Sequence, residues 1–250
     1  MRILVTNDDG IHADGLYRLA EAMRALGEVS VVAPLVERSA VGHALTLTDP
    51  LRVERVHHGG ELYGHAVNGT PADCVKLAVR MLLDRPPDLV VSGINHGANT
   101  GHNLIYSGTV SAATEGAILG IPSVAVSRAW SPDPDFGPAA EVALEVARRV
   151  LDHGLPEGIL LNVNVPALPR EGIRGFRLTE QGRGRFVETF EARVDPRGKT
   201  YYWQAGETLV ADEGEGSDDG ALAAGYVSVT PIHYDLTARA FLPALAEWGW

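Results

Sequence analysis

Short runs of β-branched residues alternate with helical patterns over roughly the first 165 residues, and few folds accommodate such an alternation. The run at 2–6 is followed from Asp14 by apolar residues at helical spacing, which stop at Gly27, and a second run follows at 29–34. Strand, helix and strand in this order make one crossover unit of a parallel sheet. The sequence therefore predicts an α/β fold with a mainly parallel sheet flanked by helices.

Further elements continue this pattern. Thr70, Pro71 and Asp73 form an N-cap, a first-turn proline and a capping-box acid, so a helix is predicted over 71–84. The other predicted elements are short strands within 44–67, strands at 88–92, 121–127 and 159–166, and helices that end near position 120 and cover 138–151. A polar loop at 93–109 separates two of them, and loops of that length are usually functional or disordered.

The character of the chain changes after Pro166, where hairpin-like segments replace the alternation. We expect a catalytic core at 1–166 and a C-terminal arm at 167–250, part of which is able to complete the core. The stretch at 212–220 has five acids and three glycines, which predicts a solvated, mobile loop. The final residues predict an apolar helix with a kink at Pro243. Because a hairpin and such a helix need a surface to pack on, we expect a homodimer or a homotetramer.

Composition narrows the classes of function. Cys74 is the only cysteine, which excludes an intrachain disulfide or a thiolate-caged metal and fits a reducing cytoplasm. No apolar run approaches the length of a membrane span, and acids appear by position 8, where a signal peptide is still apolar. We therefore expect a cytoplasmic protein without membrane contact. The net charge of -11 argues against binding duplex nucleic acid, although a small anion can bind at a metal ion or helix N-terminus.

The first strand ends in the acidic sequence Asn7-Asp8-Asp9-Gly10, which has two interpretations. Asx residues followed by glycine are typical of a turn. Two adjacent carboxylates also repel each other, which a bound cation would relieve. The residues themselves leave both interpretations open.

Two more polar clusters follow strands of the predicted sheet. Arg38 and Ser39 follow the second strand, and Asn95, His96 and Asn99 follow the strand at 88–92. Ligands of open α/β sheets bind beyond the carboxyl ends of the strands, so these side chains and the paired acids are expected to converge. Carboxylate, hydroxyl and amide oxygens suit Mg²⁺, Mn²⁺ or Ca²⁺. Each residue alone is also compatible with an ordinary turn.

A predicted helix start supplies a second feature. Ser107, Gly108 and Thr109 precede an apolar helix, and their N–H groups and hydroxyls could bind an anion or simply cap the helix. A cation beside an anion site suggests a phosphate ester. The sequence has no dinucleotide-binding glycine motif, no P-loop and no nucleophile elbow, which counts against those three classes.

Several segments together resemble the stationary-phase survival protein SurE family. They are MRILVTNDDGIHADGL, NGTPADCV, PDLVVSGINHGANTGHNLIYSGTVSAATEGAILGIPSVAVS, LNVNVP and VTPIHYDLT. The resemblance covers nearly the whole chain. It implies a Rossmann-like domain with an extended C-terminal arm, and a divalent-metal-dependent phosphatase that acts on nucleoside monophosphates. It also implies one metal ion per subunit, Mg²⁺ or Mn²⁺, held by Asp8, Asp9, Ser39 and Asn95. Ala40 departs from the family, in which glycine is expected after the ligand serine.

We interpret the chain as a phosphomonoesterase for nucleoside 5′- or 3′-monophosphates, with Asp8, Asn95, Ser107, Gly108 and Thr109 as catalytic residues. In one route water attacks the phosphorus in line while Ser107, Gly108 and Thr109 hold phosphate oxygens. In the other, Asp8 is a nucleophile that forms an aspartyl-phosphate. The alternatives outside catalysis are a Mg²⁺-binding receiver domain, which is about half this length, and a nucleotide-binding regulator.

Overall fold

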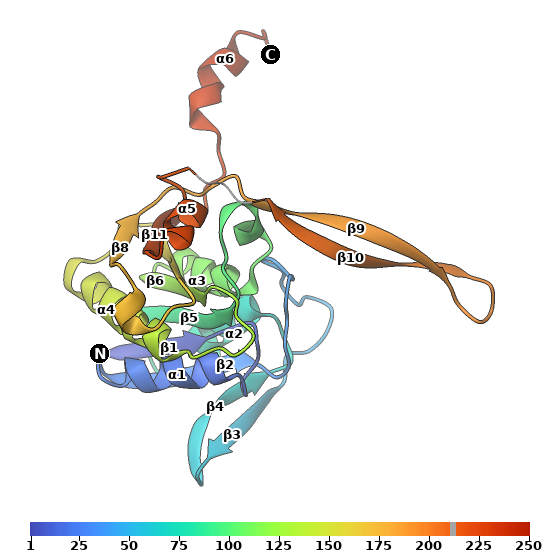
Figure 1. Cartoon of the computed structure of the whole chain (residues 1–250). Helices are drawn as coiled ribbons and strands as arrows, with labels where there is room; N and C mark the ends of the chain where they lie inside the picture. The colour runs from blue at the N-terminus through green and yellow to red at the C-terminus, as the bar shows by residue number, and fades with distance from the viewer. Residues whose placement is uncertain (211–213) are drawn as a thin grey trace.

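The computed structural model describes residues 1–210 and 214–250, and a nine-stranded sheet forms its centre (Figure 1). The order of the strands across this sheet is β3-β4-β2-β1-β5-β6-β7-β11-β8. Their bounds are β1 (Arg2–Thr6), β2 (Glu28–Pro34), β3 (Val53–His58), β4 (Glu61–Val67), β5 (Leu89–His96), β6 (Ser123–Arg128), β7 (Ile159–Val165), β8 (Phe176–Leu178) and β11 (Val227–His233).

Most of the sheet is parallel. Strand β1 lies between β2 and β5 and pairs with both in parallel, and β5, β6 and β7 continue the parallel run. The pairs β3–β4 and β7–β11 are antiparallel. The predicted mainly parallel α/β sheet is confirmed.

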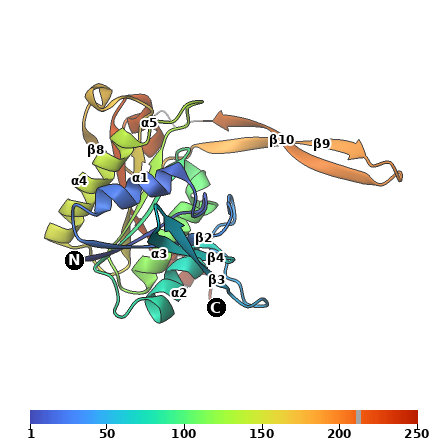
Figure 2. The same ribbon diagram turned by 90° about the horizontal axis from the view of Figure 1, so that it is seen from below.

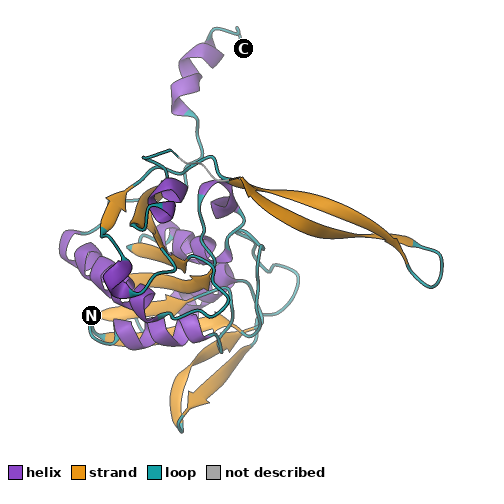
Figure 3. Cartoon of the chain, viewed as in Figure 1, coloured by secondary structure: helices purple, strands orange, loops and turns teal. Residues whose placement is uncertain are grey.

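Helices cover both faces of the sheet (Figure 3). They are α1 (Asp14–Met23), α2 (Pro71–Leu77), α3 (Gly108–Ile118), α4 (Gly137–His153), α5 (Asp218–Ala223) and α6 (Leu242–Ala246). The buried face of α1 packs with α4 in the larger apolar cluster, as Leu19 and Val146 illustrate. On the other face α2 packs with α3, where Cys74 and Ala112 share a cluster. Every helix in the described ranges is too short or too polar to cross a lipid bilayer.

Local signals explain the start of α2 and the extent of β5. The backbone N–H of Asp73 donates to the Thr70 hydroxyl at 3.1 Å, and that of Thr70 donates to the Asp73 carboxylate at 2.9 Å, which forms the expected capping box. The helix predicted over 71–84 is shorter as an α-helix, because it continues after Leu77 as a π-helical turn, η1 (Ala78–Leu82). The strand expected to end at position 92 continues to His96 beside β6, with a shift of register at Gly93. A side chain at Gly93 would lie 2.2 Å from the Val126 carbonyl oxygen, so only glycine fits this approach.

Two C-terminal segments project from the body of the molecule. The strands β9 (Arg185–Val194) and β10 (Thr200–Val210) form a separate antiparallel hairpin that extends far from the sheet (Figure 2). The tail leaves the sheet after β11 and ends in η4 (Arg239–Phe241) and α6, at a distance from both the hairpin and the core (Figure 1). Pro243 lies in the first turn of α6 instead of kinking a longer helix, which is where a proline is tolerated without loss of a hydrogen bond.

The acidic stretch at 212–220 differs from its expectation. Residues 212 and 213 lie outside the described residues, but Ser217 caps α5 and Asp218 is completely buried. The Asp218 carboxylate accepts the backbone N–H groups of Gly101 at 3.0 Å and Gly182 at 2.9 Å. Burial raises its pKa, although these hydrogen bonds act in the opposite direction. The prediction of a solvated loop is therefore wrong at Asp218, because its carboxylate is buried and accepts hydrogen bonds from backbone groups that are distant in the sequence.

Candidate functional site

A cavity of about 710 Å³ lies at the carboxyl ends of β1, β2 and β5, beside the first turn of α3. It is lined by residues from all of the expected clusters, including Asp8, Asp9, Ser39, Asn95 and Ser107. Parallel strands bring their carboxyl ends to one edge of the sheet, which explains the convergence. Gly108 and Thr109 follow directly, and both contact Asp8.

The residues of the acidic turn after β1 have different roles. The amide nitrogen of Asn7 donates to the Gly10 carbonyl at 3.0 Å, and the Gly10 N–H donates to the Asn7 amide oxygen at 3.2 Å. Gly10 has a φ of 101°, a backbone conformation that favours glycine. Asn7 thus forms the turn that the sequence suggested, while Asp8 and Asp9 line the cavity.

Asp8 is tied closely to the start of α3. The Thr109 hydroxyl donates to Asp8 Oδ1, and a side chain at Gly108 would come within 2.7 Å of the Asp8 Cβ. Gly108 is therefore needed for the close approach of the helix to β1. Burial raises the pKa of Asp8, although the contact with Thr109 acts in the opposite direction. The Thr109 hydroxyl, which was expected to contact phosphate, thus donates to the Asp8 carboxylate. Ser107 caps the helix, since its oxygen accepts the Val110 N–H at 3.1 Å.

Negative charge accumulates around Asp9. Burial, and then the charges of Asp8 and Glu37, raise the pKa of Asp9 to about 7. The Ser39 hydroxyl donates to Glu37 Oε1 at 2.5 Å, which holds the serine beside the pair of acids. Ala40 has a φ of 54°, a conformation that favours glycine and agrees with the glycine expected at this position. The site is an acidic cluster in which like charges stand close together.

The end of β5 contributes Asn95 and His96 to the cavity. The amide nitrogen of Asn95 donates to the Gly97 carbonyl at 2.7 Å, which leaves the amide oxygen of Asn95 as its group for a cation. The His96 ring stacks on Trp130 and hydrogen-bonds through Nε2 to the Ser131 carbonyl at 2.9 Å. His96 is therefore held at the cavity wall by the segment after β6.

A buried amide network supports the loop after β5. The backbone N–H of Asn99 donates to the Asn164 side chain at 2.8 Å, and its carbonyl accepts from Asn162 at 2.8 Å and from Asn164 at 3.1 Å. Asn99 itself lines the cavity. Asn162 and Asn164 are buried polar residues within β7, and an apolar strand interrupted by two asparagines is the sequence signal for this support.

Sequence reasoning missed several residues that also line the cavity, among them Glu37, Asn103, Tyr106 and Gln204. Glu37 is adjacent to Arg38, and Asn103 and Tyr106 lie in the expected polar loop at 93–109. Their positions in the sequence therefore indicated that they lie near the site. Gln204 belongs to β10, and no local pattern connects a strand of the arm to this site. Arg38 points elsewhere, because its guanidinium donates to the Asn68 carbonyl at 3.0 Å.

The loop that carries Ser39 is anchored on α3 by the buried carboxylate of Glu115. His43 Nε2 lies 2.8 Å from Glu115 Oε2, and Lys76 Nζ lies 3.0 Å from Glu115 Oε1. Burial alone would raise the pKa of Glu115, but its contacts with His43 and Lys76 outweigh burial and lower it. Glu115 thus links the Ser39 loop, α2 and α3.

The residues at the cavity fit a hard divalent cation. Two carboxylates, a hydroxyl and an amide oxygen form an all-oxygen donor set. A bound cation would lower the raised pKa values of Asp8 and Asp9, because its charge stabilises the ionised carboxylates. Over residues 1–210 and 214–250, no three His, Cys, Asp or Glu side chains form a metal-binding group. A cation here would therefore depend on neutral oxygen ligands and water as well as on the acids.

Comparisons with known proteins match one family over most of the chain. The family model described as survival protein SurE matches residues 3–188. A protein of Syntrophobacter fumaroxidans named 5′-nucleotidase SurE is 53% identical over 249 residues, which is all of both chains. A protein of the same name from Geobacter sulfurreducens is 51% identical, over 99% of this chain and 94% of its own.

The crystal structure of the SurE protein from Aquifex aeolicus has a similar fold. It superposes with a TM-score of 0.84 at 43% identity and covers 99% of both chains. The match therefore includes the C-terminal segment beyond the reach of the family model. This chain belongs to the SurE family.

Proposed function

We propose that this chain is a divalent-metal-dependent phosphomonoesterase that hydrolyses nucleoside 5′-monophosphates, and by the same chemistry 3′-monophosphates, to nucleoside and phosphate. The observation that carries the proposal is the paired Asp8 and Asp9 in an oxygen-lined cavity beside the first turn of α3. Relatives that share half of its residues over the full chain are named 5′-nucleotidases.

The proposed metal ligands are Asp8, Asp9, Ser39 and Asn95, with one Mg²⁺ or Mn²⁺ ion per subunit. Metal dependence is general in the SurE nucleotidase family. When bound, the cation would polarise a phosphoryl oxygen and ease the deprotonation of an attacking water. The hydrogen bond from Thr109 orients the Asp8 carboxylate, and Glu37 holds the Ser39 hydroxyl in position.

The start of α3 is proposed to hold the phosphate. Ser107 and Gly108 stand at the positive end of an eleven-residue helix, which favours an anion, and the Ser107 N–H also donates to the Leu104 carbonyl at 3.3 Å. Thr109, proposed earlier in this role, acts here chiefly through Asp8 because its hydroxyl already donates to that carboxylate. Asn95 would contact both the cation and the substrate.

Two routes for the phosphoryl group are compatible with this arrangement. Water can attack in line, or Asp8 can attack to form an aspartyl-phosphate that water then hydrolyses. Rapid acid quenching of the enzyme with labelled nucleotide, followed by mass spectrometry of the peptide that contains Asp8, separates them. A phosphorylated Asp8 supports the covalent route, and its absence during steady turnover supports direct attack.

Phosphate release from a panel of nucleoside 5′- and 3′-monophosphates tests the function itself. We expect turnover with Mg²⁺ or Mn²⁺, loss of turnover after extensive chelation, and recovery when the metal is returned. Full activity in chelated protein would contradict the metal requirement. Nucleotide binding without phosphate release under all metal conditions would instead identify a regulator.

The oligomeric state is part of the proposal, with a homodimer or homotetramer expected in the cytoplasm. Large apolar side chains on the hairpin and tail face solvent in the single chain, with Phe190 70%, Tyr202 67% and Trp250 88% exposed. Monomeric proteins seldom leave such surfaces uncovered. Light scattering after size exclusion should give at least twice the mass of the chain, 26.7 kDa, and deleting 237–250 should yield a monomer or an aggregate. A monomer of the full chain at micromolar concentration would contradict it.

A further inference from the structure

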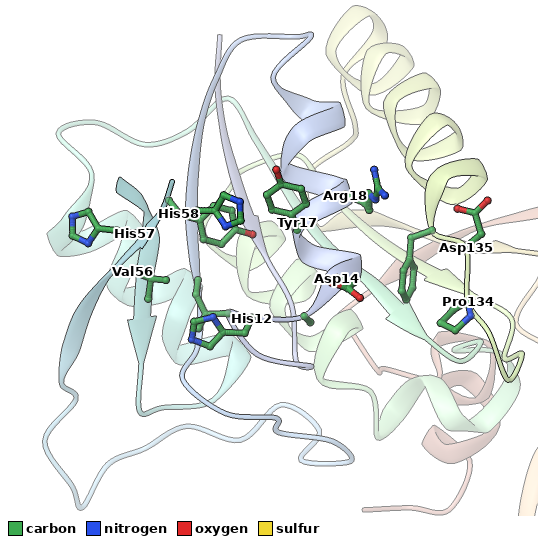
Figure 4. A pocket seen from close by; sticks show the side chains of 13 residues that line it. His12, Asp14, Tyr17, Arg18, Val56, His57, His58, Pro134 and Asp135 are labelled. Carbon is green, nitrogen blue, oxygen red and sulfur yellow. The ribbon is translucent and has the colours of Figure 1, made fainter. Parts of the chain in front are cut away.

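A second cavity, of about 480 Å³, lies between α1, the β3–β4 hairpin and the segment before α4 (Figure 4). It shares no lining residue with the cavity that contains Asp8 and Asp9. Its volume is within the range of small-molecule sites and suits a molecule of nucleoside size. Nothing in the proposed phosphatase reaction uses it.

Aromatic rings form one wall of this cavity. Tyr17 on α1 lies 5.2 Å from His58 and 6.0 Å from Tyr63, measured between ring centroids, and His58 and Tyr63 are 6.4 Å apart. Figure 4 shows Tyr17 extending from the helix toward His58 on the strand. The three rings are mutually tilted, and tilted or offset ring contacts are favourable for a further aromatic ring. A planar ligand can therefore pack against this wall.

A hydroxyl without a partner adds a polar requirement. Among the described residues, Tyr63 Oη is buried and has no hydrogen-bond partner. Burial also raises the pKa of Tyr63 to about 12, so the hydroxyl stays protonated, and because Oη is almost inaccessible an acceptor would have to displace the groups that cover it. An unpaired buried hydroxyl is costly, and a ligand with an acceptor at its edge would remove that cost.

The charged groups of the cavity do not form a metal site. His12, His57 and His58 all line it, but no group of three or more His, Cys, Asp or Glu side chains in the described residues is placed to hold a metal ion. Arg18 stands near the opposite rim together with Asp135 (Figure 4). The cavity thus combines an aromatic wall, an unpaired donor, one guanidinium and two carboxylates.

We propose that this cavity binds a nucleobase, carried by a nucleoside or a nucleotide, at a site separate from the catalytic centre. The base would pack on Tyr17 and His58, and an acceptor on its edge would receive the Tyr63 hydroxyl. A purely apolar ligand would leave that hydroxyl unpaired, and a simple anion would not use the aromatic wall. The proposal does not depend on the metal ligands or the reaction at the other cavity.

Equilibrium dialysis of labelled adenosine tests the proposal on the full chain, with metal removed by a chelator so that nothing is hydrolysed. We expect saturable binding in which one equivalent per chain is weakened at least about five-fold by His58→Ala and by Tyr17→Ala, since a stacked base loses that much with one ring. Tyr17→Phe should retain it, because the ring remains. His58 is exposed, so its removal leaves the core intact even if Tyr17→Ala unfolds the chain.

The matched control is Tyr106→Ala, which removes an aromatic side chain from the other cavity. Binding that survives Tyr106→Ala and is lost in His58→Ala supports the second site. Binding lost in Tyr106→Ala and kept in His58→Ala overturns it, as does the absence of saturable binding up to millimolar adenosine.

Adenosine monophosphate in the same experiment distinguishes the two carriers of the base. Tighter binding of the nucleotide that Arg18→Gln reduces to the level of adenosine means that the site accepts nucleotides. Equal binding of both means that it recognises the nucleoside portion. Failure of the reaction at Asp8 and Asp9 would appear only in the phosphate-release assay, so the two proposals fail separately.

Discussion

The central sheet and the β9–β10 hairpin use similar residues in opposite ways. In the sheet, Leu4 and Val5 are completely buried between helices. On the hairpin, Phe190, Tyr202 and Trp203 face solvent, although an isolated hairpin is marginally stable in water. The core therefore derives its stability from packing within one chain, whereas the exposed apolar side chains of the hairpin are free to pack against a partner. Stability and the proposed assembly thus depend on separate parts of the chain.

The sharpest test of this contrast is a pair of truncations of large apolar side chains. Leu19→Ala, in the buried face of α1, should lower the free energy of unfolding by about 2–5 kcal/mol, because it removes core contacts and leaves a cavity. Tyr202→Ala should change it by less than about 0.5 kcal/mol in dilute protein. Urea unfolding at several protein concentrations measures both. Equal destabilisation by the two variants in monomeric protein would show that the hairpin folds as part of the core.

The same contrast applies to acidic residues. Asp9→Asn should lower kcat at least ~10²-fold, about 2.7 kcal/mol, because the proposed metal site loses a charge. Asp195→Asn is the control and should leave kcat unchanged, because Asp195 lies at the far end of the hairpin, where its carboxylate accepts the local backbone N–H groups of Arg197 and Lys199. A fully active Asp9→Asn enzyme would remove Asp9 from the metal site.

Thr109→Val tests whether the Thr109 hydroxyl orients the Asp8 carboxylate for the proposed metal ion. The Thr109 hydroxyl donates to Asp8, and a hydrogen bond to a charged group contributes roughly 1.5 to 3 kcal/mol. We expect about a ten-fold or larger rise in the metal concentration that gives half-maximal activity. Thr114→Val on the same helix is the control, since its hydroxyl bonds only the Val110 carbonyl. Unchanged metal dependence with a raised KM for nucleotide would instead assign Thr109 to the phosphate.

The smallest expected effect concerns pH. The pKa of Glu115 is lowered in the folded state, so its contribution to stability is present above the ordinary pKa of about 4.5 and is lost as the pH falls through the lower, folded value. Because Lys76 is half exposed, the contribution should be below about 1 kcal/mol. Glu115→Gln should flatten the loss of stability below pH 4.5, as followed by urea unfolding, while Glu54→Gln on exposed β3 should not. An unchanged slope in Glu115→Gln would show that the pair does not stabilise the fold.

Local patterns predicted the core and most of the candidate site. The spacing of apolar residues gave α1 and its neighbouring strands, and the parallel order then implied that Asp8, Ser39 and Asn95 meet at one edge. Asp8 lies just after β1, Ser39 lies in the loop after β2 and Asn95 lies near the end of β5, so the position of each depends on its own strand. The turn and cation interpretations of the acidic sequence also proved compatible, because Asn7 forms the turn and the aspartates do not.

Features that depend on distant parts of the chain were not predictable. Asp218 was assigned to a solvated loop because acids and glycines are typical of loops, yet its partner Gly101 is 117 positions away. Gln204 reaches the cavity only because the hairpin starts beside it. Single-sequence patterns carry no information about such contacts, since neither residue differs locally from an ordinary loop or strand residue.

The hydrogen bond from Gly101 to Asp218 has a consequence for the order of events during protein synthesis. Gly101 begins η2 (Gly101–Ile105), the segment that precedes Ser107 and carries Asn103 to the cavity. The N-terminal strands and helices can fold while the ribosome is still adding residues. The Asp218 carboxylate emerges only near the end of translation, so this contact to the wall of the cavity forms late. A nascent chain that already has β1 to β7 and both aspartates should therefore remain inactive until Asp218 and β11 have emerged.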